Sequence, residues 1–251
     1  MAKIISFINE KGGIGKSSIL FNSAWELSKK NKILMIDLDG QAANLTYYCG
    51  IQKTDELKTV FNVLVNGTDI RETIVSVKDN LDLVPAKSEV STLPENSSPG
   101  KLMKQLGEIY NDYDYIFIDV SPTPNKSHFL ALCVCDFAII PMLPDASSLK
   151  GLDGITESIT ETKFMNPKLK VLGIVFNKNE NRTNLSKEVK TKTEILSKAL
   201  DCTPFSATIR QSVKSGENIA KHIGITDYVP NEAISNDYLN FIKEMEERIN
   251  G

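Results

Sequence analysis

Short runs of apolar residues, many of them β-branched, recur along the chain between longer segments with helical periodicity. The runs are nearly continuous, which indicates strands buried on both faces, as in a parallel sheet covered by helices. They occupy residues 4–8, 33–36, 81–84, 115–118, 137–140 and 171–176. The helical segments occupy residues 17–29, 101–110, 147–163, 184–200 and 231–249. This alternation predicts an α/β fold with a doubly wound, mostly parallel sheet and helices on both faces.

The alternation continues without a break, so we expect residues 1–251 to form a single domain. Residues 88–100, rich in proline, serine and asparagine, are predicted to form a surface loop. The last helical segment has one apolar side and a mixed, acid-rich polar side. A helix lying on a membrane would carry a basic polar side, so this helix is predicted to dock against the core.

Other features of the chain favour a cytoplasmic protein with no membrane partner. No apolar run approaches the roughly 20 residues that span a bilayer. The chain enters its first strand pattern at residue 4, which leaves no room for a signal peptide. The cysteines form neither a zinc pattern nor a disulfide framework, which favours reduced thiols. They are Cys49, Cys133, Cys135 and Cys202.

Composition and charge narrow the range of partners. Apolar residues make up 41% of the chain and charged residues 24%, which is ordinary for a globular protein. With a formal net charge of -3, any contact with nucleic acid depends on a local basic patch. Such a patch would give salt-sensitive, sequence-independent binding. The candidates, which few acids dilute, are Lys163, Lys168, Lys170, Lys178, Arg182, Lys187, Lys190, Lys192, Lys198, Arg210, Lys214 and Lys221.

The segment between the first strand and the first helix has the composition of a phosphate-binding loop. Its glycines let backbone N–H groups curl around phosphate oxygens, and the following helix adds the partial positive charge of its N-terminus. Lys16 is expected to contact the β- and γ-phosphates of ATP, and the Ser17 hydroxyl is expected to bind Mg²⁺. The predicted nucleotide-binding residues of this loop are Lys11, Gly12, Gly13, Ile14, Gly15, Lys16, Ser17 and Ser18.

Lys11 is an additional cation in this loop, next to Glu10, which stands where the usual frame has a glycine. Two ammonium groups beside the same phosphates repel each other in a partly desolvated site. The second lysine becomes favourable when it meets phosphate charge that belongs to another protomer. Lys11 therefore predicts a homodimer in which two protomers enclose ATP.

With these residues in view, the sequence resembles the ParA/MinD family of deviant Walker A ATPases, in the ParA branch of DNA-partitioning proteins. Residues 9–18 are similar to the family's Asn-x-Lys-Gly-Gly-Val-Gly-Lys-Thr-Thr. Residues 37–46 resemble its Asp-x-Asp-Pro-Gln-x-x-Asn block, residues 115–122 its Walker B strand, and residues 141–151 its Pro-Val-Gln-x-Glu segment. The resemblance covers most of the chain and implies that Lys11 of each subunit reaches the partner's ATP.

Three features depart from the family pattern. Gly40 replaces a proline, which we expect to loosen that turn. Leu143 and Asp145 stand where glutamine and glutamate are expected, so no role is transferred to them. No winged or helix-turn-helix extension precedes the first strand, which favours the compact type that is not an operator-binding repressor.

Three aspartates follow predicted strands or end them. Asp37 and Asp39 lie two residues apart, so both side chains can point to the same face. Phosphoryl transfer to water needs a positioned nucleophile and neutralised charge. The resemblance makes Asp39 the candidate that orients the attacking water, with Lys11 and Lys16 as catalytic cations. Asp37 would support Mg²⁺ or Lys16 indirectly, and Asp119 would hold Mg²⁺ through water.

The base of the nucleotide has candidates from the second half of the chain. Asn177 follows an apolar strand and is predicted to read the purine edge; the alternative is a cap of the following loop. Residues 207–210 look like the family's Thr-x-Ile-Pro-Arg segment without its proline. The resemblance therefore places Ile209 and Arg210 beside the adenine.

The resemblance implies a partition ATPase that dimerises on Mg-ATP, binds DNA non-specifically and is stimulated by a ParB-type partner. Slow intrinsic hydrolysis is expected, because no arginine is placed to act as a finger within the chain. Three alternatives stay open: a MinD-like protein acting at a membrane, an ATPase that positions protein cargo, and an iron–sulfur relative. The last would need Cys133 or Cys135 at the dimer interface.

Overall fold

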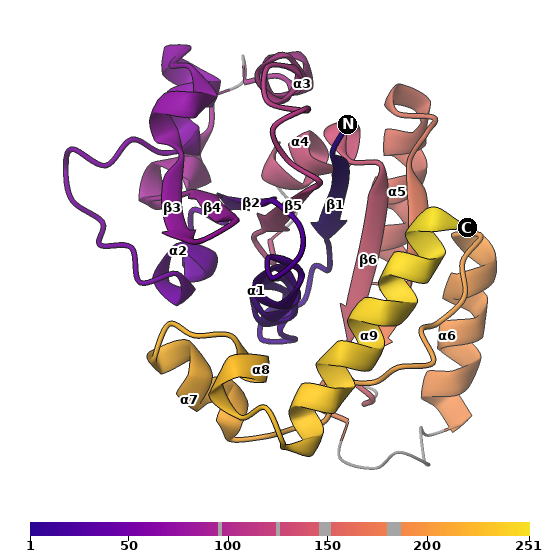
Figure 1. Ribbon diagram of the computed structural model, residues 1–251. Helices are drawn as coiled ribbons and strands as arrows, with labels where there is room; N and C mark the ends of the chain where they lie inside the picture. Colours follow the sequence, from indigo (N-terminus) through magenta and orange to yellow (C-terminus); the bar gives the residue numbers. More distant parts are fainter. Residues whose placement is uncertain (95–96, 124–125, 146–151, 180–186) are drawn as a thin grey trace.

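The computed structural model describes residues 1–251 except residues 95–96, 124–125, 146–151 and 180–186. Within the described residues, one seven-stranded sheet has the strand order β3-β4-β2-β5-β1-β6-β7. Neighbouring strands pair in parallel except β3 and β4, which pair antiparallel, so the predicted mostly parallel sheet is confirmed (Figure 1). The strands are β1 (Lys3–Phe7), β2 (Ile33–Leu38), β3 (Val75–Lys78), β4 (Leu81–Val84), β5 (Tyr115–Val120), β6 (Phe137–Met142) and β7 (Lys170–Phe176).

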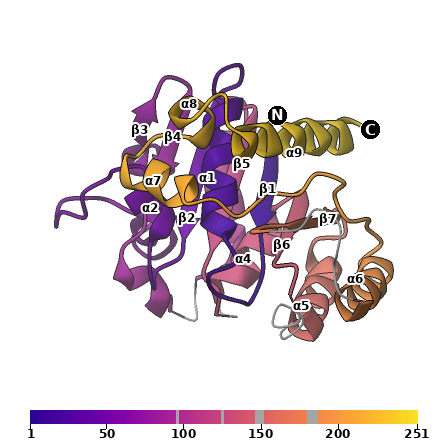
Figure 2. The ribbon, with the colours of Figure 1, turned by 90° about the horizontal axis from the view of Figure 1, so that it is seen from below.

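Helices lie on both faces of this sheet, as the alternating pattern predicts. Figure 2 shows α1 and α9 on one side and α4, α5 and α6 on the other. The described helices are α1 (Lys16–Leu27), α2 (Asn44–Tyr48), α3 (Pro99–Gly107), α4 (Lys126–Val134), α5 (Leu152–Met165), α6 (Lys187–Ala199), α7 (Lys214–Ala220), α8 (Ile225–Tyr228) and α9 (Ala233–Asn250). A π-helical turn η1 (Asn62–Asn66) and two 3-10 segments, η2 (Ile70–Thr73) and η3 (Ser88–Thr92), lie in the connections.

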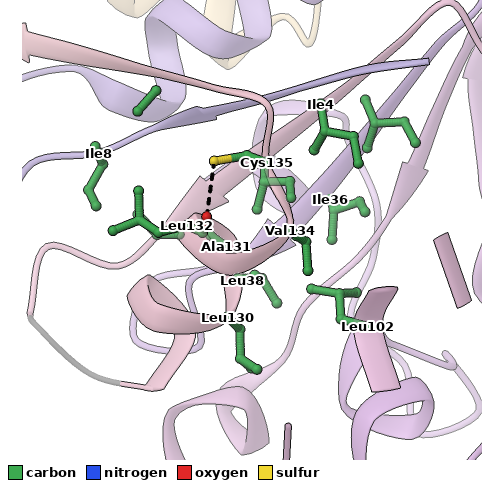
Figure 3. Close-up of a cluster of buried hydrophobic side chains, with 14 of the residues drawn as sticks. Ile4, Ile8, Ile36, Leu38, Leu102, Leu130, Ala131, Leu132, Val134 and Cys135 are labelled. Carbon is green, nitrogen blue, oxygen red and sulfur yellow. Dashed lines mark hydrogen bonds between the residues drawn. The ribbon is translucent and has the colours of Figure 1, made fainter. Parts of the chain in front are cut away.

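Each face of the sheet has its own hydrophobic core, because successive side chains of a strand point to opposite faces. Along β1, Ile4 belongs to the cluster that includes residues of α3 and α4, whereas Ile5 belongs to the cluster that includes residues of α1 and α9. Figure 3 shows part of the first cluster. Cys135 lies inside it, and its Sγ donates to the carbonyl of Leu132 at 3.7 Å.

The burial of the cysteines bears on the iron–sulfur alternative. Cys133 and Cys135 are 4% and 1% exposed. Burial raises the pKa of the Cys133 thiol to about 11 and raises that of Cys135 further above its usual range. A cluster shared by two protomers needs cysteine ligands at the protein surface. Cys133 and Cys135 are both buried, which argues against the iron–sulfur alternative.

The last helix docks against the sheet, as its apolar side predicts. Phe241 and Met245 of α9 are fully buried. Near the end of the helix, Arg248 donates to the carbonyls of Leu172 and Thr203 at 2.6 and 2.7 Å, which ties α9 to β7. Among the described helices, none is both long enough and apolar enough to cross a bilayer.

The outer side of β7 is accompanied by the backbone of residues 205–209. The N–H of Phe205 donates to the carbonyl of Ile174 at 2.8 Å, and the N–H of Ile209 donates to the carbonyl of Phe176 at 2.9 Å. This segment therefore occupies hydrogen-bonding groups along the edge of the sheet and leads directly into residue 210.

Several elements differ from the predictions. α2, α4, α7, α8 and β3 were not predicted, and the expected surface loop at residues 88–100 contains η3 and the first residues of α3. The starts of the helices predicted at 147–163 and 184–200 lie outside the described residues, and α5 and α6 are described from residues 152 and 187.

Candidate nucleotide-binding and catalytic site

A cavity of about 420 Å³ opens beyond the carboxyl ends of the central strands, where sheets of this kind bind ligands. Nine of the predicted site residues line it: Gly12, Gly13, Gly15, Lys16, Ser17, Ser18, Asp39, Asn177 and Arg210. Five others lie next to it without lining it: Lys11, Ile14, Asp37, Asp119 and Ile209. Further residues, which no pattern in the sequence selects for this role, also line the cavity: Asn44, Tyr48, Gln211, Ser212 and Tyr238.

The phosphate-binding loop depends on a glycine at its last turn before α1. Gly15 has φ +92°, and a Cβ at this position would lie 2.1 Å from Nδ2 of Asn177. Both the backbone conformation and the space therefore exclude a larger residue. Asn177 approaches this closely because its Nδ2 donates to the carbonyl of Ile14 at 2.7 Å.

A second side chain from the end of β7 holds the same loop. Nζ of Lys178 donates to the carbonyl of Gly13 at 2.8 Å. Lys178 has φ +53°, a conformation that non-glycine residues seldom adopt. Asn177 and Lys178 thus hold two successive loop carbonyls, and this arrangement favours loop N–H groups that face an anion. The amide of Asn177 therefore contributes to the shape of the loop.

The two lysines of the loop occupy different environments. Lys16 is 5% exposed, and its Nζ donates to the carbonyl of Lys11 at 3.3 Å. Burial lowers the pKa of Lys16, while the charges of Asp119 and Asp39 counteract that shift. Lys11 is more exposed, and its Nζ lies 3.8 Å from Oδ1 of Asp145. Lys16 is therefore placed within the cavity and Lys11 outside it.

Asp37 and Asp39 hold each other and the turn after β2. Oδ1 of Asp37 accepts from the N–H of Asp39 at 3.0 Å, and its Oδ2 accepts from the N–H and hydroxyl of Thr46 at 2.9 and 2.7 Å. Burial raises the pKa of Asp37 to about 6 against these hydrogen bonds. Asp39 lines the cavity and accepts from the N–H of Gln41 at 3.0 Å. Both carboxylate oxygens of Asp37 are thus engaged in hydrogen bonds outside the cavity, whereas Asp39 is one of the residues that line it.

Asp119 pairs in register with Asp37 across β5 and β2 but is bonded differently. It is fully buried, and neither carboxylate oxygen has a hydrogen-bond partner among the described residues. Burial, and after it the charge of Asp37, raise the pKa of Asp119 to about 8. The Ser17 hydroxyl stands close enough to offset part of this rise without reaching hydrogen-bond geometry. Orphaned carboxylate oxygens beside a hydroxyl fit a hard divalent cation such as Mg²⁺.

The opposite wall of the cavity comes from the segment after residue 209. Arg210 lines the cavity and is held by Asp237 of α9, whose Oδ2 accepts from Nε at 2.5 Å and whose Oδ1 accepts from NH2 at 2.9 Å. Ile209 is 1% exposed and packs in the core with α1 and α9. Of the two residues predicted to lie beside the adenine, Arg210 lines the cavity and Ile209 lies in the hydrophobic core next to it.

Comparisons with known proteins identify the family of this chain. The profile of a family described as an AAA domain matches residues 2–171. The chain is 29% identical over 253 residues to the sporulation initiation inhibitor protein Soj of Bacillus subtilis, covering 98% of each chain. It is 30% identical over 197 residues to the chromosome partitioning protein ParA of Myxococcus xanthus, covering 75% of this chain and 69% of that protein. A structure described as a plasmid partition protein of Borrelia burgdorferi bound to AMPPNP has a TM-score of 0.80 at 28% identity, covering 99% of this chain and 100% of that one. The chain belongs to the ParA/MinD family of P-loop ATPases.

One departure of this ParA/MinD-family chain has the opposite effect from the one expected. Gly40 was predicted to loosen the turn after β2. A Cβ at Gly40 would lie 2.2 Å from the backbone N of Ser91 and 2.7 Å from the carbonyl carbon of Val90. The backbone of Gly40 therefore packs directly against η3. A residue with a Cβ at this position would force the turn and η3 apart.

The basic residues of this ParA/MinD-family chain whose surroundings are described lie at several places around β7 and α7. Lys163 and Lys170 lie beside a second cavity near the start of β7, whereas Lys178 and Arg210 line the cavity beyond its end. Lys214 lies in α7, and its Nζ pairs with Glu217 at 2.9 Å. Arg182 and the Lys187 side chain lie outside the described residues. Lys163 and Lys170 are thus separated from Lys178 and Arg210 by the length of β7.

Proposed function

We propose that this ParA/MinD-family chain is an ATP-dependent DNA partition ATPase. It binds Mg-ATP, forms an ATP-sandwiched homodimer, binds DNA non-specifically and hydrolyses ATP slowly until a ParB-type partner stimulates it. It acts in the cytoplasm and joins the nucleoid when ATP-bound. Residues 1–251 form its single domain, a proposal supported by the packing of both hydrophobic clusters on one sheet.

The observation that carries this proposal is that the two loop lysines lie in different places, one lining the cavity and one outside it. Lys16 lines the cavity and serves the nucleotide of its own protomer. Lys11 does not line it and instead lies within 3.8 Å of Asp145, on the outside of the loop. A lysine in that position has a short route to phosphate charge on a second protomer. The gain is largest when the two charges meet in a water-excluded interface.

The remaining residues supply the parts that phosphoryl transfer to water requires. Gly12, Gly13, Gly15 and Ser18 hold the phosphates through the loop, and Asn177 and Arg210 shape the two walls. Ser17 and Asp119 hold Mg²⁺ with support from Asp37; the ion neutralises phosphate charge when bound. Asp39 faces the cavity and orients the attacking water, and Lys11 and Lys16 stabilise the charge that develops on the phosphates.

The relatives described as partition proteins support a role in partition, and the lysines of the second half of the chain support DNA binding. Dimerisation doubles any such basic surface, so ATP can switch DNA binding on without altering the surface itself. No base-reading motif is visible in the sequence, so the binding is expected to be non-specific and salt-sensitive.

DNA retention with ATP, with ADP and without nucleotide, across a salt series, tests the proposal. Wild type is compared with Lys11→Ala and with Lys243→Ala, a matched loss of one charge at an exposed position on α9. We expect retention that requires ATP and Lys11, weakens with salt and is unaffected by Lys243→Ala.

Two outcomes contradict the partition function. If Lys11→Ala still forms an ATP dimer and stays on DNA, the sandwich is wrong. If lipid vesicles or a protein cargo retain the ATP form and DNA does not, the MinD-like or cargo-positioning alternative replaces it.

A further inference from the structure

Thr46 joins the carboxylate pair to a distant strand. Its hydroxyl donates to Oδ2 of Asp37 at 2.7 Å and accepts from the N–H of Ala86 at 2.9 Å. Thr46 is fully buried, and Ala86 follows β4 in the segment that leads to η3. Both hydrogen-bonding functions of the hydroxyl are thus used, one on the catalytic turn and one on the segment after β4. Replacing the hydroxyl with a methyl group removes one hydrogen bond from Oδ2 of Asp37 and one from the N–H of Ala86.

The same segment touches the turn a second time, on the other side of Asp39. There Gly40 lies so close to η3 that a Cβ would meet the backbone of Ser91. Val90, 2% exposed, anchors η3 in the core, and Ser91 itself is exposed. Because backbone packs on backbone here, neither side can yield by rotating a side chain. The contact is therefore a rigid stop for the turn.

The turn is also fixed from within. Oδ1 of Asp39 accepts from the N–H groups of Gln41 and Ala42 at 3.0 and 3.3 Å. Ala43 follows with φ +46°, a left-handed conformation that costs an alanine of order 1 kcal/mol. A residue stays in such a conformation only where its surroundings impose it. The two contacts with residues 86–91 are the surroundings that flank this turn.

We infer that Thr46, together with the segment at residues 86–91, positions Asp39 for hydrolysis. The two outer contacts clamp residues 37–40, so the carboxylate of Asp39 is aimed at the cavity before nucleotide arrives. Thr46 acts through Asp37 and Gly40 acts through η3; neither lines the cavity. This inference rests on the proposed ATPase function. It makes η3, with its exposed Ser91, a place where a displacement would alter the catalytic turn without touching the phosphate loop.

Steady-state hydrolysis and ATP affinity measured on four variants test this role. Thr46→Val keeps the shape and removes the hydroxyl, and Thr46→Ser restores the hydroxyl. Gly40→Ala inserts a Cβ against Ser91, and Gly107→Ala is its control, because open space surrounds the missing Cβ of this α3 residue. We expect Thr46→Val and Gly40→Ala to lower kcat by about tenfold to a hundredfold, with the Kd for ATP unchanged. Thr46→Ser and Gly107→Ala are expected to hydrolyse ATP at the wild-type rate.

Hydrogen exchange of the amides of Asp39 and Ala86 provides a readout that does not depend on hydrolysis. Thr46→Val is expected to accelerate exchange at both amides, and Gly40→Ala at Asp39. If the wild type does not hydrolyse ATP, the proposed function is wrong. The exchange rates of the Asp39 and Ala86 amides then still test whether Thr46 and Gly40 hold the turn. Unchanged exchange in both variants overturns the inference, and so does a kcat that survives Thr46→Val and Gly40→Ala. A loss of kcat in step with ATP affinity also overturns it, because it assigns the residues to binding.

Discussion

The wall of the cavity proposed to hold the phosphates, called the phosphate side, and the wall proposed to hold the base, called the base side, are built in contrasting ways. The phosphate side is a contiguous loop whose shape depends on backbone, with Gly15 at its tightest point. The base side is assembled from residues that are distant in sequence, such as Arg210 and Tyr238, and it is fixed by side-chain bonds such as Arg210 to Asp237. The loop is constrained mainly by its own backbone conformation, with two side-chain bonds from Asn177 and Lys178, whereas the opposite wall depends chiefly on side-chain bonds. Substitutions on the two sides should therefore differ in both size and kind.

The largest effect is expected for Gly15→Ala. The new Cβ would displace the Asn177 amide while φ stays at +92°, so strain and a lost hydrogen bond add. We expect a cost to binding of about 3 kcal/mol, or roughly a hundredfold in Kd, for ATP and for tripolyphosphate alike. Competition binding with a fluorescent nucleotide measures both ligands.

Gly67→Ala is the matched control, because Gly67 has φ +72° with open space around it and lies outside the cavity. It should lower stability by about 1 kcal/mol and leave both affinities unchanged. If Gly15→Ala binds tripolyphosphate normally, the phosphate side does not depend on backbone shape as described.

The next effect is expected on the base side, for Arg210→Met. The change removes both side-chain bonds to Asp237 but leaves the phosphate loop intact. We expect ATP to bind about tenfold more weakly and tripolyphosphate to bind as before, since about 1–2 kcal/mol of hydrogen bonding is lost. Arg210→Lys keeps the charge but not the two-pronged geometry, so its affinity for ATP should lie between those of the wild type and Arg210→Met. An equal loss for both ligands would erase the distinction between the two sides.

A smaller effect, of opposite sign, is expected for Asp119→Asn in the nucleotide-free protein. The folded state raises the pKa of Asp119 from its ordinary value near 3.8 to about 8, so the folded protein binds more protons than the unfolded one between these values. Stability therefore falls as pH rises through this window. Removing the charge should stabilise the protein by about 1 kcal/mol at pH 8 and by less at pH 5.

Urea denaturation at the two pH values measures this difference. Mg-ATP should stabilise the wild type more than Asp119→Asn, because the variant lacks the carboxylate for the ion. A variant that is less stable at pH 8 would mean that the orphaned carboxylate has a partner after all.

The smallest effect is expected for Lys178→Met, which removes one bond from Nζ to the Gly13 carbonyl. The bond is solvent-exposed, so we expect about a threefold rise in Kd for ATP and tripolyphosphate. Lys30→Met, an exposed lysine just after α1, is the charge-matched control and should change neither. If the Kd rises for ATP but not for tripolyphosphate, Lys178 acts on the base side and its assignment to the phosphate side is wrong.

The phosphate side was predictable because its chemistry is local. Glycines, lysines and serines within ten residues, placed between a strand and a helix, specify a phosphate loop without knowledge of tertiary contacts. The six apolar runs likewise predicted six of the strands, because continuous burial leaves a continuous apolar pattern. The exception, β3, has only four residues and one paired neighbour, β4.

The base side and α4 were not predictable for related reasons. Residues 126–134 are buried nearly all round, so α4 has no polar side to reveal a helical period. Tyr238 looks like a core residue in its helix, and its place in the cavity wall depends on how α9 docks. Gly40 looked like a loosened turn because the segment that fills its space, η3, is about 50 residues away. Contacts of this range leave no local pattern.

The backbone strip along β7 has a consequence for aggregation. An uncovered outer strand offers a row of unpaired N–H and C=O groups to other chains. In this protein residues 205–209 occupy part of that row, and the next residue, Arg210, belongs to the cavity wall. A bound nucleotide that steadies Arg210 therefore also steadies the strip that shields the sheet. Nucleotide-free protein should therefore form intermolecular β-structure sooner than nucleotide-bound protein. Binding of nucleotide would in this way reduce aggregation through the edge of β7.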